Sequence, residues 1–143
     1  MARGKENPAT GALAKVNLFA GLSTKQLAVI AEACREEHFA EGETIVSNGD
    51  TSARFYLIIG GSADVTANGR KRATLGPGDY FGELAVLDQG PRSATVVATS
   101  ATTAMSLAPF NLRAALHDNP EITLRMLTSM CGRLRLAEKA VTS

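Results

Sequence analysis

The feature that most restricts the fold of this sequence is a series of short segments rich in Val, Ile and Thr between residues 44 and 107, separated by turn signals. Segments of this length and composition, divided by Gly, Asn and Pro, are typical of antiparallel strands. Asn68-Gly69 is the strongest turn signal, because a type I′ hairpin turn needs positive φ at both central positions. Many short strands at close intervals predict a closed unit, a jelly roll or barrel, in preference to an open sheet. The expected strands are Thr44–Ser47, Arg54–Ile59, Ala63–Ala67, Arg70–Leu75, Ala94–Ala98 and Thr102–Leu107.

Helical spacing flanks this region on both sides. Residues 12–36 are expected to be helical, with a capping-box pattern from Ser23 to Gln26 inside the segment and the polar residues 35–38 at its end. From Pro109 a short helix is expected to stop near Asn119-Pro120, and a last helix to run from about Glu121 to Lys139. The predicted fold class is therefore α+β: an antiparallel β-roll, or jelly-roll-like barrel, flanked by N-terminal and C-terminal helices.

Length and charge narrow the class of protein. The 143 residues fit one domain, 1–143, in which the polar residues 1–11 are expected to be a disordered lead-in. With 15 basic and 14 acidic residues, the chain has no strong overall field for DNA or an anionic membrane. No apolar run approaches the ~20 residues of a membrane span, and the N-terminus lacks the apolar core of a secretion signal. We expect a cytoplasmic protein that binds neither nucleic acid nor membrane.

The cysteines and histidines give no sign of a metal site. Cys34 and Cys131 lie 97 positions apart, whereas metal ligands usually come in closely spaced pairs. Both are expected to be buried, reduced thiols in segments with helical patterning. His38 and His117 lack partners at ligand spacing and are expected at the surface or at helix ends. No metal and no catalytic residue is predicted.

The most informative segment is Phe81–Thr95, which lies between two expected strands. Gly82 permits an unusual backbone angle or the close approach of a ligand, and residues 83–87 can form one short helical turn with free N–H groups at its start. Arg92 returns beside that turn with a planar fork suited to two phosphate oxygens. Glu83, nine residues earlier, can accept a hydrogen bond from a sugar hydroxyl. The segment thus offers a site for one phosphate joined to one ribose.

This segment resembles the phosphate-binding cassette of the cyclic nucleotide-binding domain family. The family pattern, Phe-Gly-Glu-Leu-Ala followed by Pro-Arg-Ser/Thr/Ala-Ala-Thr, is matched at every fixed position. Similarity continues outside the cassette in the residues 16–23, 42–50 and 55–61, and extends over roughly residues 13–139. The resemblance implies a β-roll whose C-terminal helices, residues 109–139, act as a hinge and a lid.

The resemblance also implies a role for individual residues. Arg92 would pair with the cyclic phosphate, and Glu83 would hold the ribose 2′-hydroxyl. Backbone N–H groups near Ala85 and the hydroxyl of Ser93 would complete the phosphate cradle, while Gly82 would let the ribose approach. Serine at position 93 is similar to bacterial members that bind cAMP, whereas members preferring cGMP often have threonine there. The expected ligand-binding residues are Gly82, Glu83, Leu84, Ala85, Arg92, Ser93, Ala94 and Arg133.

The last helix carries a second, weaker signal. At about 100° per residue, an apolar face is formed by Ile122, Met126, Leu127, Met130, Leu134, Ala137 and Val141. Arg133 falls at the edge of that face and could lie over a purine ring when the helix closes. An arginine whose stem packs on the apolar face while its head reaches water would explain the pattern equally well.

The function expected from the sequence is non-catalytic cyclic nucleotide sensing, most of all of cAMP, in which bound ligand switches the C-terminal helices and regulates a separate effector protein. Self-association into a homo-oligomer is left open. One alternative is a domain of the same fold that binds no nucleotide, where Arg92 would pair only with Asp88 or Glu83; another is a cGMP-preferring sensor. A phosphodiesterase would want metal ligands or a positioned base and nucleophile, which the two unpartnered histidines do not supply. The initiating Met favours a complete, stand-alone protein of bacterial type, although a fragment of a larger regulator stays open.

Overall fold

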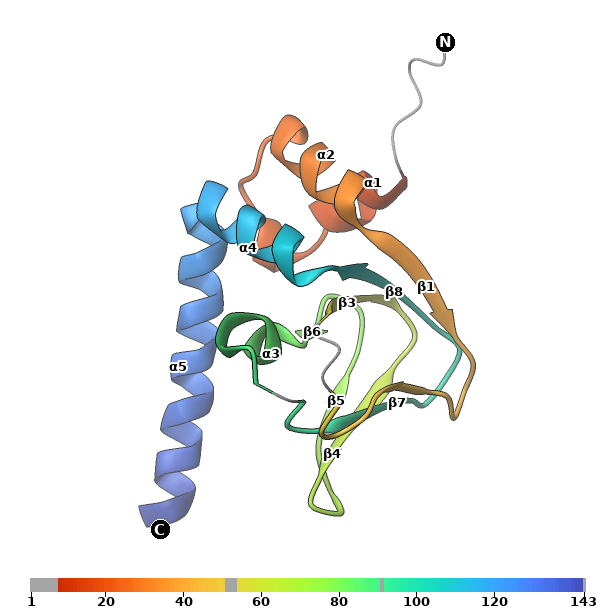
Figure 1. Ribbon diagram of the computed structural model, residues 1–143, viewed down its shortest axis with the longest axis vertical. Coiled ribbons are helices and arrows are strands. Elements are labelled where there is room, and N and C mark those ends of the chain that lie inside the picture. Colours follow the sequence, from red (N-terminus) through yellow and green to blue (C-terminus); the bar gives the residue numbers. More distant parts are fainter. Residues whose placement is uncertain (1–7, 51–53, 91, 143) are drawn as a thin grey trace.

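The computed structural model describes residues 8–50, 54–90 and 92–142 (Figure 1). Three short helical elements come first, a β-roll follows, and two helices close the chain. The helices are α1 (Pro8–Ala14), the 3-10 turn η1 (Asn17–Phe19), α2 (Thr24–Ala33), α3 (Glu83–Asp88), α4 (Pro109–Asp118) and α5 (Pro120–Thr142). The strands are β1 (Arg35–Phe39), β2 (Thr44–Val46), β3 (Phe55–Gly60), β4 (Ala63–Ala67), β5 (Arg70–Leu75), β6 (Tyr80–Phe81), β7 (Thr95–Ala98) and β8 (Thr102–Leu107).

The strands form two antiparallel sheets of four, in the orders β1-β8-β3-β6 and β2-β7-β4-β5. This confirms the predicted α+β fold with its antiparallel β-roll between N-terminal and C-terminal helices. The β4–β5 hairpin turns at Asn68 and Gly69, with φ of 54° and 74°, as a type I′ turn requires. All six strands expected from the sequence are present, each within a residue or two of its expected limits.

The N-terminal region differs from its prediction. Residues 12–36 are not one helical stretch, because Cys34 is extended and Arg35–Phe39 form β1, paired with β8. Burial along residues 35–39 alternates with the period of two of a strand: Glu37 and Phe39 are partly buried and their neighbours are exposed. Because residues 35–38 are all polar, this alternation does not appear as a hydrophobic pattern in the sequence. Residues 1–7 of the expected lead-in lie outside the described residues, and residues 8–11 are not a disordered lead-in but the start of α1. The Ser23–Gln26 capping box at the start of α2 is confirmed.

Two apolar clusters hold the fold together. The larger joins the N-terminal helices to α4, the start of α5 and one face of the β1-β8-β3-β6 sheet, with Phe55, Leu112 and Ile122 buried in it. The smaller fills the interior of the roll and includes Ile58 and Phe81. The Phe81 ring stacks on the ring of Tyr56 with centroids 5.1 Å apart. Because Phe81 is the first residue of the cassette, this stacking fixes where the cassette leaves the sheet.

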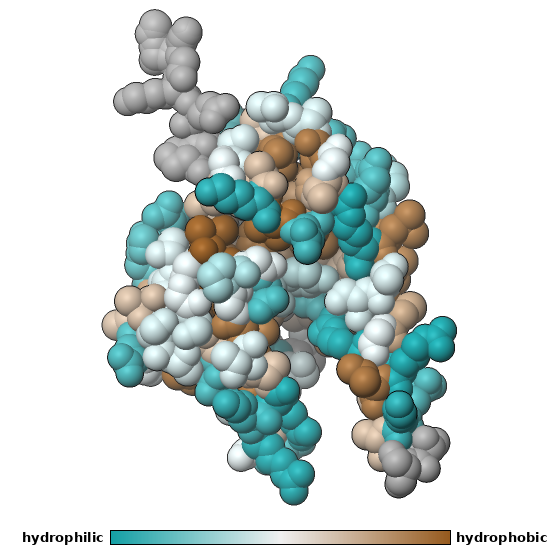
Figure 2. Space-filling model, turned by 180° about the vertical axis from the view of Figure 1, so that it is seen from behind, coloured by the Kyte–Doolittle hydropathy of each residue, from teal (hydrophilic) through white to brown (hydrophobic). Residues whose placement is uncertain are grey.

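Helix α5 is partly buried in its first half and exposed in its second. Ile122 and Met126 are 0% and 2% exposed, and Met130 is half-buried. Residues 131–141 are all exposed, so the predicted apolar face meets the core only as far as Met130. Figure 2 shows this part of the helix standing away from the roll, with a hollow between them. Among the described residues, no helix is long and apolar enough to span a membrane.

The prediction that both cysteines are buried is wrong for Cys131. Cys131 is exposed rather than buried, because it lies on the exposed second half of α5, and only Cys34 is partly buried. Both histidines are exposed, as expected, and His38 lies 2.8 Å from Glu36.

Candidate functional site

The cassette begins with a backbone conformation that suits glycine. Gly82 has φ of 93° and immediately precedes α3, which starts at Glu83. A Cβ at position 82 would lie 2.5 Å from Nη1 of Arg92 and 2.6 Å from the carbonyl oxygen of Arg54. Any other residue would therefore be strained in its backbone and would displace the arginine. The positive φ confirms the prediction of an unusual backbone angle at Gly82. The group that lies close to it in the structure is Arg92, and the approach of a ligand stays a prediction.

Arg92 is held rigidly by its backbone. Its N–H donates to the carbonyl of Asp50 at 3.0 Å, and its own carbonyl accepts from the N–H of Gly49 at 2.9 Å. Nη2 donates to the carbonyl of Arg54 at 2.5 Å, and the guanidinium carbon lies 6.0 Å from the centre of the Tyr56 ring. The Arg92 backbone is thus held by residues 49–50 and its side chain by Arg54 and Tyr56, all of which are distant from it in the sequence.

The rest of the Arg92 head group has no partner among the described residues. The residue is 5% exposed, and its Nε and Nη1 are buried without a hydrogen bond in that part of the chain. Burial lowers the pKa of the Arg92 guanidinium from its usual value, and nearby acidic groups, Tyr56 first, oppose the shift only in part. A buried guanidinium with two free donors is costly unless an anion pairs with it. The arrangement therefore favours binding of an anion at this point.

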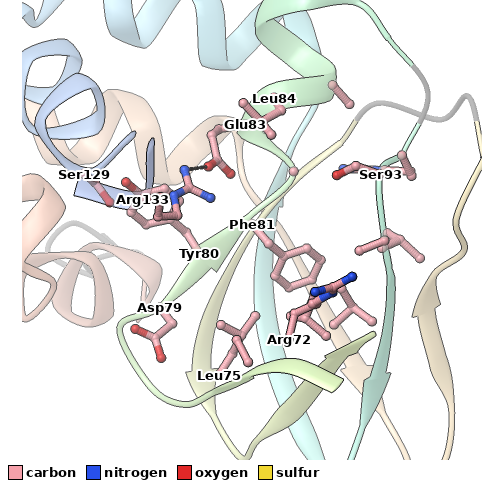
Figure 3. Close-up of a pocket in the computed structure, with 18 of the residues that line it drawn as sticks. Arg72, Leu75, Asp79, Tyr80, Phe81, Glu83, Leu84, Ser93, Ser129 and Arg133 are labelled. Carbon is pink, nitrogen blue, oxygen red and sulfur yellow. Dashed lines mark hydrogen bonds and ion pairs between the residues drawn. The ribbon is translucent and has the colours of Figure 1, made fainter. Parts of the chain in front are cut away.

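Glu83 supplies a buried acid beside this cation. It is 3% exposed, and its Oε2 accepts a hydrogen bond at 2.5 Å from Nη2 of Arg133, which reaches across from α5 (Figure 3). One turn earlier on α5, Ser129 hydrogen-bonds Tyr80; burial raises the pKa of that tyrosine, and the hydrogen bond from Ser129 works in the opposite direction. The cassette acid is thus in contact with the C-terminal helix.

Around these two side chains lies a cavity of about 540 Å³. This volume is within the roughly 300–1,000 Å³ of small-molecule sites. The cassette forms one wall, the four strands of the second sheet form another, and Ser129 and Arg133 of α5 complete it. Figure 3 shows Phe81 between two groups of lining residues, with Glu83 and Leu84 on one side of the ring and Arg72 and Leu75 on the other. The cavity can therefore bring an anion site, a buried acid and an apolar wall to one ligand.

The structure brings all eight expected site residues to this cavity. Each of them is on its wall: Gly82, Glu83, Leu84, Ala85, Arg92, Ser93, Ala94 and Arg133. Their exposure differs, since Ala85 is buried while Leu84 and Ser93 are exposed. Arg133 contacts Glu83, a contact that the sequence did not predict.

Sequence reasoning missed several lining residues outside the cassette. They include Val46, Val65, Arg72, Leu75, Tyr80 and Ser129. Strict strand alternation would place Arg72 and Leu75 on opposite faces of β5. Both line the cavity because the pairing of β4 with β5 shifts register at Arg72, which sequence patterning does not show. Arg72 adds its guanidinium to those of Arg92 and Arg133 on the wall. No group of three or more His, Cys, Asp or Glu residues that could hold a metal ion occurs in the described part of the chain.

Comparison with known proteins decides the family. The model of the cyclic nucleotide-binding domain matches residues 36–119, which run from β1 through the cassette to the end of α4. The chain belongs to the cyclic nucleotide-binding domain family. The cavity described above lies within the matched region except for Ser129 and Arg133, which α5 contributes.

Three relatives show the kinds of protein to which this chain is similar. A CRP-like cAMP-activated global transcriptional regulator of Mycobacterium tuberculosis is 30% identical over 128 residues, covering 86% of this chain and 57% of that protein. The structure of the Thermus thermophilus catabolite activator protein has a TM-score of 0.78 at 29% identity, covering 87% of this chain and 61% of that one. The regulatory domain of Toxoplasma gondii PKA, crystallised with cAMP, has a TM-score of 0.78 at 25% identity, covering 89% and 51%. This chain spans less than two thirds of the length of each relative.

Proposed function

We propose that this domain binds a cyclic nucleotide, cAMP first, as a non-catalytic sensor. The observation that carries the proposal is the buried Arg92, whose Nε and Nη1 have no partner among the described residues and which shares a cavity with the buried acid Glu83. The cAMP named in the descriptions of two relatives, a Mycobacterium tuberculosis regulator and a Toxoplasma gondii regulatory domain, supports the same ligand class.

The phosphate of the ligand would take the free donors of Arg92. A singly charged cyclic phosphate offers two exocyclic oxygens, which match the Nε and Nη1 donors of one guanidinium. Backbone N–H groups near Leu84 and Ala85, together with the Ser93 hydroxyl, would complete the cradle. Ala94 would form part of its wall, and Gly82 leaves room because it has no side chain. This pairing would satisfy the buried donors that the described part of the chain leaves open.

The ribose 2′-hydroxyl would donate to Glu83, and the base would lie against the apolar wall. Adenine is the first choice because serine at position 93 resembles cAMP-binding members. Arg133, at the edge of α5, would reach the base if that helix closed over it. The proposed switch is a change in the C-terminal helices, which would act on a separate effector protein. A cytoplasmic location stays a prediction.

A cGMP-preferring sensor is the second candidate, and Arg72 favours it. This guanidinium lines the cavity from β5, on the far side of the Phe81 ring from Glu83 in the view of Figure 3. Guanine presents two acceptors, O6 and N7, that an arginine can bind together, whereas adenine presents an amino donor at the corresponding position. A base held near Arg72 would therefore be recognised better as guanine.

Calorimetric titration with cAMP, cGMP and 5′-AMP tests the proposal. We expect one site per chain for a cyclic nucleotide and weaker binding of 5′-AMP, whose open, doubly charged phosphate does not match the cradle. Equal binding of 5′-AMP, or no binding of either cyclic nucleotide by the folded protein, would overturn it. Repeating the titration with Arg72→Ala separates the two candidates, because only a guanine-selective site would lose its preference for cGMP.

A further inference from the structure

The contact between Arg133 and Glu83 joins the cassette to the C-terminal helix. Its two ends are unequal, since the Glu83 side chain is 3% exposed and that of Arg133 is 55% exposed. The first half of α5 is fixed by the core through Ile122 and Met126, and by Arg125, whose Nη1 donates to the carbonyl of Leu18 at 2.9 Å. Residues 131–141 are all exposed, so the bond to Glu83 anchors a part of the helix that the core does not hold.

The carboxylate end of this bond is the group that the proposed function assigns to the ribose. A hydrogen bond between charged groups contributes about 1.5–3 kcal/mol, and less where one partner faces water. Glu83 is too buried to lose Arg133 without gaining another donor, because a buried carboxylate without hydrogen bonds is costly. A ribose 2′-hydroxyl is such a donor, and it would arrive from the cavity side. A hydroxyl would therefore replace the guanidinium, and it would shift the position of α5 only by the free energy of the bond that it gains with Glu83 in the open state.

We propose that the Arg133–Glu83 ion pair is a latch that holds the second half of α5 against the cassette, and that the 2′-hydroxyl of a bound nucleotide opens it by taking the Glu83 carboxylate. This inference rests on the proposed function. It assigns the two parts of the ligand separate tasks. The phosphate, through Arg92, provides affinity, and the ribose hydroxyl, through Glu83, controls the position of α5.

The alternative arrangement is that ribose and Arg133 share the carboxylate, each on its own oxygen. In that case a bound nucleotide would leave the latch closed, and the position of α5 would not depend on the 2′-hydroxyl. The two arrangements are distinguished by comparing cAMP with 2′-deoxy-cAMP, which keeps the phosphate and the base and lacks only the hydroxyl.

Spin-label distance measurement provides the readout. Cys131 is exposed on α5 and lies roughly 200° around the helix from Arg133, so a label there leaves the latch side free. Lys71→Cys gives the second position on β5, because Lys71 is exposed and is not among the residues that line the cavity. Cys34→Ala removes the other thiol. Calorimetry on the labelled protein first establishes concentrations that saturate the site with each nucleotide.

With saturating cAMP, we expect the distance distribution between the labels to shift from that of the free protein. With saturating 2′-deoxy-cAMP, we expect the distribution of the free protein to persist. In Arg133→Ala, the free protein should already show a broadened distribution, and the two nucleotides should then give the same result. Arg135→Ala, which removes an exposed charge from the same helix, is the matched control and should behave as the parent protein.

The possible failures are separable. If both nucleotides bind and shift α5 alike, or if neither shifts it, the latch is wrong while the cyclic nucleotide site stands. If calorimetry detects no binding of either nucleotide to the labelled protein or to the unlabelled parent, the proposed function itself fails.

Discussion

Replacing Arg92 with alanine should abolish most nucleotide binding and leave the fold intact. The side chain is 5% exposed and keeps its Nε and Nη1 without partners within the described residues, so its head group is prepared for an anion. Removing a buried partner of a charged ligand group costs about 2–5 kcal/mol. We therefore expect the Kd for cAMP to rise by about 30-fold to several thousand-fold.

The same geometry predicts a small effect on stability, which is unusual for a buried residue. The substitution removes one hydrogen bond, from Nη2 to the carbonyl of Arg54, which contributes about 0.5–1.5 kcal/mol. It also removes two buried donors that have no partner, each of which costs about 1–3 kcal/mol while it stays unsatisfied. Because these contributions oppose each other, the free energy of unfolding should fall by no more than about 1.5 kcal/mol, the contribution of the lost hydrogen bond.

Calorimetry with cAMP and urea unfolding on the same preparations measure both quantities. Arg92→Lys keeps the charge but not the planar fork, and should bind between the parent and the alanine variant. Arg35→Ala, which removes an exposed arginine on β1 away from the cavity, is the control for loss of one positive charge. Unchanged affinity in a folded Arg92→Ala protein would refute the assignment of the phosphate site. A loss of several kcal/mol of stability would show that Arg92 is a structural residue.

Three further outcomes follow from the same structure. Ser93→Thr should raise the affinity for cGMP relative to cAMP, because the added methyl restricts the hydroxyl rotamer; an unchanged ratio by calorimetry would place base selection elsewhere. Deleting residues 131–143, which removes Arg133, should lower the Kd for cAMP in calorimetry, because Arg133 would no longer compete with the ribose hydroxyl for Glu83; the Tm should stay near that of the parent, since residues 131–141 are exposed. Deleting 121–143 should instead lower the Tm strongly, because it removes the buried Ile122 and Met126. Burial raises the pKa of the Cys34 thiol to about 11, so its alkylation, followed by mass spectrometry, should keep accelerating roughly tenfold per pH unit from about pH 8 to pH 10; a plateau below pH 9 would contradict this.

The parts of the fold and of the site that the sequence predicted are those that depend on the local backbone conformation. Gly82 lies where φ is positive, Asn68-Gly69 forms the turn of a hairpin, and Ser23 with Gln26 caps the start of α2. Each of these is decided by a few adjacent residues, and the structure confirms them. The cassette lies in one continuous stretch for the same reason, and all its expected residues are on the cavity wall.

The parts that the sequence did not predict depend on contacts between distant segments. Strand β6 has only two residues, Tyr80 and Phe81, and exists because β3 is there to pair with it. Strand β1 was not predicted, because its residues are mostly polar and it pairs with β8, which is distant in the sequence. The exposure of Cys131 follows from where the core ends along α5, which helical spacing alone does not show, since spacing gives the direction of a side chain and not the presence of a neighbour.

Helix α3 is the element through which a ligand would act on the rest of the molecule. Two arginines from the C-terminal helices contact it: Arg113 of α4 donates to the carbonyl of Val86 at 2.6 Å, and Arg133 of α5 pairs with Glu83. A displacement of α3 would therefore pull on both helices together. The start of α5 resists such a pull, because Ile122 and Met126 are buried in the core. The exposed residues after Met130 do not resist it, so bending of α5 near Met130 is the motion that this packing permits at least cost.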